Sequence, residues 1–68
     1  MSYNRKKFLA ALHNAGVAFV REGGGHTIVR GPAGRQSSIP RHGDVNRIMA
    51  RKIAKQLGVD WSQIERGL

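Results

Sequence analysis

The chain of 68 residues contains no cysteine, so neither a disulfide nor a thiolate metal site can stabilise it. A domain of this length buries only roughly 60% of the surface that its unfolded chain exposes, and its core is therefore thin. We expect one domain over residues 1–68 that depends on close packing or on a partner. The lack of cysteine also fits a reducing, intracellular location.

Long apolar runs are missing as well. The segment from Asn4 to Val20 has a basic start followed by apolar residues, as a secretion signal does, but His13, Asn14 and Gly16 interrupt it. No segment approaches the roughly 20 apolar residues that cross a membrane. We therefore expect a soluble, cytoplasmic protein with no membrane partner.

Acidic residues are scarce: four Asp and Glu stand against twelve Lys and Arg, which leaves a net charge of +8. Such a surface attracts polyanions and repels copies of itself, so nucleic acid or an acidic protein is the expected partner. Aromatic residues are also few, and most of them lie where packing can use them: Tyr3, Phe8, Phe19 and Trp61. The sequence therefore does not support sequence-selective recognition of unpaired bases, which needs aromatic side chains free to stack on them.

The pattern of apolar residues predicts a helix, three strands and a second helix. Apolar positions recur at helical spacing from Ser2 or Tyr3 to Ala15, and Gly16 ends that helix. Turn residues separate three short runs rich in branched or polar strand formers. The predicted strands span Val17–Glu22, His26–Arg30 and Arg35–Ile39, and Pro40 closes the last one.

The second helix is predicted from an N-cap at Asp44 to Leu57, with Gly58 as its end. A short further turn should begin at Asp60, with Gln63 in the capping-box position. One half of the second helix is apolar and the other cationic. The predicted apolar half consists of Met49, Ala50, Ile53, Ala54 and Leu57. Ile48 lies among the cations, which indicates that the sheet or a partner covers part of that half.

These elements predict an α+β fold of two layers, in which two amphipathic helices cover one face of a three-stranded antiparallel sheet. Double-stranded-RNA-binding domains share this order of helix, three-stranded sheet and helix. Because unrelated functions use the same fold, the order alone does not assign one.

His26 follows three glycines at the start of the second strand. If Thr27 and Val29 point to the core, His26 and Arg30 share the open face, although the opposite register would also place Ile28 in the core. The glycines would let a phosphate or ribose approach the ring. Most histidines after glycines simply begin a strand, so both interpretations of His26 stay open.

His42 lies in the loop before the cationic helix. Two histidines can act as base and acid in cleavage of RNA through the ribose 2′-hydroxyl, because histidine titrates near neutrality. The other interpretation is that His42 caps or packs against the helix. His13 falls on the polar half of the first helix, where a solvated side chain is expected.

No pair of ligands has the spacing of a metal site, and the three glycines lack the lysine and hydroxyl of a phosphate-binding loop. We therefore predict no metal and no cofactor. A set of basic residues is expected to contact phosphates, which gives affinity without sequence choice. The set comprises Arg30, Arg35, Arg41, Arg47, Arg51, Lys52 and Lys55.

Two motifs follow the first helix in a distinctive order: EGGGHTIVRGPAGRQSSIPRH, from Glu22 to His42, and RKIAKQLGV, from Arg51 to Val59. In this order and spacing, from about Phe8 to Val59, the chain resembles the HicA family of toxins from bacterial toxin–antitoxin pairs. The resemblance implies a small endoribonuclease that cuts messenger RNA, a HicB-like antitoxin as protein partner, and a fold like that of double-stranded-RNA-binding domains.

The resemblance also implies a site. The family's catalytic histidine follows a Gly-Ser pair, which maps onto Gly24, Gly25 and His26, so Gly25 stands in place of the serine. The family's later Pro and His map onto Pro40 and His42. Two other classes of function stay open: an RNA-binding module without catalysis, and a non-enzymatic protein whose basic face docks an acidic partner.

Overall fold

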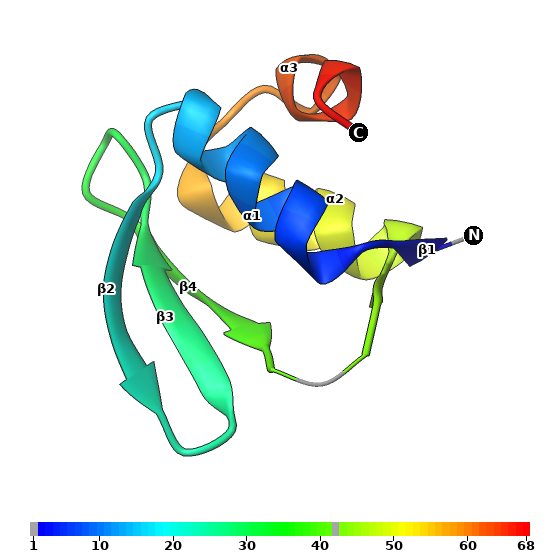
Figure 1. The fold of residues 1–68 in the computed structure, drawn as a ribbon. Helices are drawn as coiled ribbons and strands as arrows, with labels where there is room; N and C mark the ends of the chain where they lie inside the picture. The colour runs from blue at the N-terminus through cyan, green and yellow to red at the C-terminus, as the bar shows by residue number, and fades with distance from the viewer. Residues whose placement is uncertain (1, 42) are drawn as a thin grey trace.

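A three-stranded antiparallel sheet with helices on one side forms the framework of the protein. The computed structural model describes residues 2–41 and 43–68. Strands β2, β3 and β4 lie in that order in the sheet, and the helices gather on one side of it (Figure 1). This arrangement confirms the predicted α+β fold. The elements are β1 (Ser2–Tyr3), α1 (Arg5–Asn14), β2 (Ala18–Gly23), β3 (His26–Arg30), β4 (Gln36–Pro40), β5 (Val45–Asn46), α2 (Arg47–Leu57) and α3 (Trp61–Arg66).

The start of α2 differs from the prediction. Strand β5 pairs antiparallel with β1, so the chain is still extended beyond Asp44. Asp44 is therefore not the N-cap. The helix begins at Arg47, and Asn46 caps it: its side-chain oxygen accepts a hydrogen bond of 2.8 Å from the backbone N–H of Met49. Asn and Asp serve equally well as caps, and the two-stranded pairing decides which residue is used.

The first helix is also shorter than predicted at its start. Asn4 is its N-cap and accepts hydrogen bonds from the backbone N–H groups of Lys6 and Lys7. Its end agrees with the prediction, because Gly16 follows the helix with a φ of 92°. Gly58 ends α2 in the left-handed conformation, as predicted. Asp60 caps α3, which confirms the short terminal helix.

The core lies between the sheet and the helices, and every helix contributes to it. Its largest fully buried side chains include Phe8, Leu12, Ile39, Leu57 and Ile64. Helix α2 packs along β4, while α3 contacts α1 and α2. None of the helices in residues 2–41 and 43–68 has the length and apolar character that a bilayer span requires.

Two apolar residues at the start of α2 lie outside this core. Met49 was predicted to be buried but is 39% exposed, and the neighbouring Ile48 is 71% exposed. The helix buries Ala50, Ile53 and Ala54, so Met49 lies at the rim of the packed face. The sheet does not cover Ile48.

Candidate nucleic-acid interface

The turn between β2 and β3 consists of Gly24 and Gly25. Gly23 pairs with His26 across it, so it is a two-residue hairpin turn. Both turn glycines have positive φ, 24° and 91°, as a type I′ turn requires. The turn projects away from the helices (Figure 1). A Cβ placed on either glycine would meet nothing within 4 Å, so a ligand can approach the start of β3 closely.

His26 is the first residue of β3 and lies on the outer face of the sheet. Thr27 and Val29 are buried, whereas His26 and Arg30 are exposed, which selects one of the two registers that the sequence left open. No hydrogen bond or ion pair joins the His26 ring to another of the described residues. The ring is therefore open to contact with a ligand.

A shallow groove of about 270 Å³ connects His26 with α2. His26 pairs with Pro40 across β3 and β4, and the outer face of this pair continues over the edge strand onto the helix. The groove is lined by His26, Ser38, Pro40, Met49, Lys52, Ile53 and Gln56. It therefore combines an imidazole, a cation and an amide with apolar walls.

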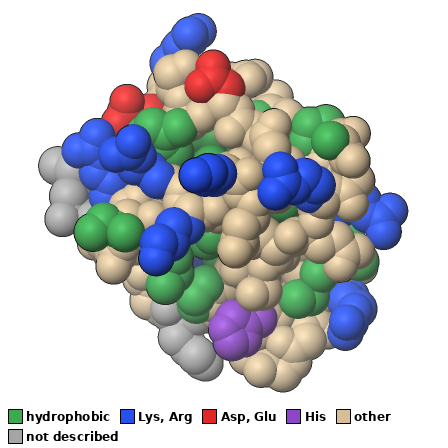
Figure 2. Space-filling model, turned by 180° about the vertical axis from the view of Figure 1, so that it is seen from behind, with side chains coloured by type: hydrophobic (Ala, Val, Ile, Leu, Met, Phe, Trp, Pro, Cys, Tyr) green, Lys and Arg blue, Asp and Glu red, His purple; other side chains and the backbone are tan. Residues whose placement is uncertain are grey.

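The predicted cations divide into two groups. Arg41 forms an ion pair with Glu22 at 3.0 Å, and Arg47 forms one with Glu65 at 3.5 Å. The remaining ones are exposed, and none has an ion pair within the described part of the chain: Arg30, Arg35, Arg51, Lys52 and Lys55. Figure 2 shows Lys and Arg side chains spread over one face of the molecule, with a histidine on the same face.

Lys52 connects the groove to a second hollow. That hollow, of about 410 Å³, is lined by Lys52 together with Arg51, Lys55 and Trp61. Cations on successive turns of an exposed helix can follow a phosphate backbone, since phosphate contacts do not depend on base identity. The groove and the hollow thus form one continuous surface beside His26, which we call the α2 face.

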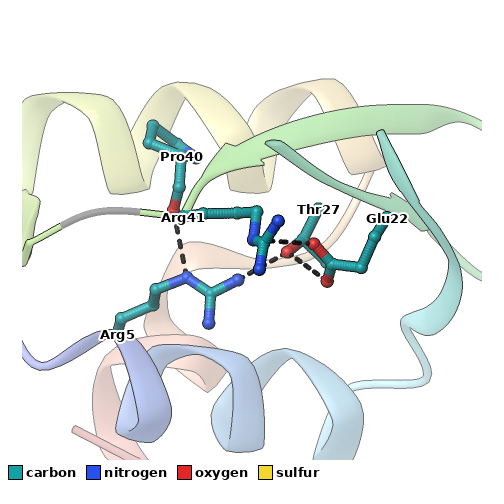
Figure 3. Close-up of polar contacts among 5 residues, drawn as sticks. All are labelled: Arg5, Glu22, Thr27, Pro40 and Arg41. Atoms are coloured by element: carbon teal, nitrogen blue, oxygen red, sulfur yellow. Dashed lines mark hydrogen bonds and ion pairs between the residues drawn. The ribbon is translucent and has the colours of Figure 1, made fainter. Parts of the chain in front are cut away.

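A polar network behind His26 was not predicted from the sequence. Arg5 at the start of α1 donates hydrogen bonds to the hydroxyl of Thr27 and, at 3.0 Å, to the carbonyl of Pro40 (Figure 3). The Thr27 hydroxyl donates to Glu22 at 2.8 Å, and Glu22 also holds Arg41. The network joins α1, β2, β3 and the end of β4.

The network also fixes the segment that follows β4. The backbone N–H of Arg41 donates to the carbonyl of Gly25 at 3.1 Å, so the glycine turn is tied to the chain that leaves β4. Arg41 therefore has a structural role on the inner side of the sheet in addition to its positive charge. The only hint of this role in the sequence is that Glu22 is one of four acidic residues.

The three histidines occupy different parts of the chain. His13 lies on α1 and lines a cavity of about 290 Å³ with Leu9 and Phe19, which is separate from the groove at His26. His42 lies outside the described residues, so its role stays a prediction. Among residues 2–41 and 43–68, no three His, Asp or Glu side chains come together as a metal site would require.

Comparison with models of protein families gives a match over most of the chain. The family model described as HicA toxin of bacterial toxin-antitoxin matches residues 5–59. The match spans the chain from the first residue of α1 to just beyond the end of α2, and it includes β2, β3 and β4 with the glycine turn and His26. No curated protein matches the chain at significant similarity.

Proposed function

Since the chain belongs to the HicA toxin family, we propose that it is a toxin that acts by cleaving messenger RNA, with His26 as a catalytic residue. The observation that carries the proposal is the position of His26. Its ring lies at the start of β3, beside a glycine turn that no other group crowds, and in a groove that also contains Lys52.

The proposed reaction needs only proton transfer and charge stabilisation. A histidine removes the proton of a ribose 2′-hydroxyl, and that oxygen attacks the adjacent phosphorus. The bond from phosphorus to the 5′-oxygen breaks, and a second acid gives that oxygen a proton. The products are a 2′,3′-cyclic phosphate and a free 5′-hydroxyl. His26 acts as base or acid, and His42 is the proposed second proton carrier.

The cations of the α2 face stabilise charge and hold the RNA. As the phosphorus gains its fifth oxygen, negative charge on the non-bridging oxygens increases, and Lys52 is the lysine that shares the groove with His26. Arg51 and Lys55 extend the contact to neighbouring phosphates. Arg30, Arg35, Arg41 and Arg47 complete the proposed RNA-binding set, and Gly24 and Gly25 give the backbone of the RNA room to approach.

A HicB-like antitoxin is the proposed protein partner, because the family consists of toxins from toxin–antitoxin systems. A partner of this kind would be acidic where it covers the α2 face. A second candidate function is an RNA-binding module that uses the same cations without catalysis, which the net charge of +8 favours.

Replacing one histidine at a time tests the catalytic proposal. We expect His26→Ala to lower the rate of RNA cleavage by about 100-fold or more, the contribution typical of general acid–base catalysis. His13→Ala is the matched control, because it removes an exposed histidine that lies away from the groove. The rate is measured with purified protein and labelled RNA on denaturing gels. A single 2′-deoxy substitution at the cut site should abolish cleavage there.

Equal rates for the His26→Ala variant and the unaltered protein would remove His26 from the mechanism. Intact RNA after long incubation with a protein that binds it would favour the RNA-binding module instead.

A further inference from the structure

The groove beside His26 has a composition that phosphate binding alone does not require. A surface that only neutralises phosphates needs cations, yet Met49, Pro40 and Ile53 form apolar walls here. Met49 is 39% exposed although it is apolar. Exposed apolar surface next to cations indicates a ligand with both an apolar face and a negative charge.

One polar side chain in the groove is held in place from below. The Gln56 side-chain carbonyl accepts a hydrogen bond of 2.6 Å from the hydroxyl of Ser37, a residue that is only 8% exposed. This bond fixes the amide and leaves its NH₂ group as a donor. Every nucleobase carries ring nitrogens or carbonyl oxygens that accept such a bond.

The groove is large enough to hold a single ring system. Its volume, about 270 Å³, lies just below the roughly 300 Å³ at which pockets for drug-sized ligands begin. Lys52 borders both this groove and the hollow that contains Arg51 and Lys55. A nucleotide whose base occupied the groove would therefore place its phosphates towards cations on the same helix.

From these observations we propose that the groove binds one unpaired base of RNA, with Met49 and Pro40 against the base and the Gln56 amide donating to its edge. The inference rests on the proposed function in so far as the α2 face binds RNA. A base in a duplex is stacked and paired, so only a single-stranded or looped nucleotide can enter. The flexible thioether of Met49 adapts to bases of different shape, so the site selects unpaired RNA rather than a sequence.

The occupied groove would also orient the chemistry. His26 lines the same groove, so a base bound there brings its own ribose near the imidazole. Met49 and Gln56 are then positioning residues. They hold the nucleotide, while His26 touches the reacting atoms.

Binding measurements without cleavage test this inference. The full chain is titrated with two 2′-fluoro RNA ligands of equal length and charge, one unpaired and one in a duplex, because the fluorine removes the nucleophilic hydroxyl. We expect the unpaired ligand to bind about tenfold more tightly. Met49→Ala should remove most of this preference. Gln56→Ala should reduce it too, and circular dichroism checks that the loss of the Ser37 partner has not unfolded the variant.

Lys55→Ala is the matched control. It removes a phosphate contact outside the groove, so it should weaken both ligands by the same factor. A second arm uses an unpaired ligand of the same length and charge that lacks its bases: the unaltered protein should bind it more weakly than the intact ligand, and Met49→Ala should bind the two about equally.

Equal affinity for paired and unpaired RNA, or an equal loss for both with Met49→Ala, would overturn the inference. Binding of an acidic peptide in the groove with no competition from RNA would overturn it as well. Failure of the proposed cleavage is a separate result: intact natural RNA, together with a Met49-dependent preference for unpaired ligands, would contradict the reaction and leave the base-binding groove standing.

Discussion

At the scale of single residues, Thr27 and His26 show how one strand serves two purposes. His26 faces outward into the groove, whereas Thr27 is 2% exposed and faces the core. The Thr27 hydroxyl is buried, so it needs partners, and Arg5 and Glu22 provide them. The bonds of Thr27 therefore fix the backbone from which the His26 ring projects.

Removal of this hydroxyl should destabilise the protein. Thr27→Val keeps the shape of the side chain but leaves Arg5 and Glu22 without their shared partner, and we expect the free energy of unfolding to fall by about 1–3 kcal/mol. Urea denaturation followed by circular dichroism measures the change. In a double-mutant cycle with Glu22→Ala, the coupling should exceed about 0.5 kcal/mol. Full additivity would show that the bond contributes nothing. Thr27→Val with Lys55→Ala provides a pair that should be additive, because Lys55 lies on the α2 face and lines a different hollow from the one that Thr27 borders.

The sequence left two directions open for His26, of which the burial of Thr27 and Val29 selects the outward one, and it did not indicate this network. Alternation along a strand follows from the pattern of Thr27, Val29 and their neighbours, since each side chain points opposite to the next. The network depends on residues far apart in the chain: Arg5 and Pro40, which share a hydrogen bond, are separated by 35 positions. No local pattern indicates that such residues meet.

At the scale of elements, Gly31 sets how closely the end of β3 approaches α2. Its turn sequence predicts a loop, and the hydrogen bond of 3.0 Å from the N–H of Gly34 to its carbonyl confirms a turn. The structure adds a second reason for glycine. A Cβ on Gly31 would overlap the backbone carbonyl oxygen of Leu57, the last residue of α2. The sheet and the helix therefore pack backbone to backbone at this point.

Gly31→Ala should consequently lower the free energy of unfolding far more than an ordinary glycine substitution does. A backbone carbonyl cannot move away as a flexible side chain can, so we expect a loss of about 1–3 kcal/mol in the free energy of unfolding. Gly23→Ala is the matched control: a Cβ there would lie 3.4 Å from the end of the Arg21 side chain, and the change should stay within about 0.5 kcal/mol. Urea denaturation compares the two. Equal midpoints and slopes would contradict the close approach.

The helix boundaries show the same limit of local patterns. Gly16 and Gly58 end helices as predicted because a C-terminal glycine acts through its own backbone conformation. The predicted start of α2 was wrong because β5 pairs with β1. That pairing joins residues more than 40 positions apart in the chain. Residues whose role is local could be predicted from the sequence. Residues whose role depends on tertiary contact could not.

At the scale of the whole molecule, the cations behind the net charge of +8 differ in their surroundings. Arg41 and Arg47 are engaged with carboxylates, while Arg51, Lys52 and Lys55 border hollows on the α2 face. Other cations, such as Lys7, lie on α1. If the α2 face is the RNA-binding surface, its cations must contribute more to salt-dependent binding than an equally charged residue elsewhere.

The salt dependence of binding distinguishes these positions. Each phosphate contact of single-stranded RNA contributes about −0.7 to the slope of log K against log salt concentration, because it releases condensed counterions. We expect Lys55→Ala to make the slope less negative by about this amount, and Lys7→Ala to leave it nearly unchanged. Both variants lose one positive charge, so a general effect of net charge would alter them equally. Titration of unpaired 2′-fluoro RNA at several salt concentrations measures the slope, and an equal shift for the two variants would place the RNA on another surface or spread it over the whole molecule.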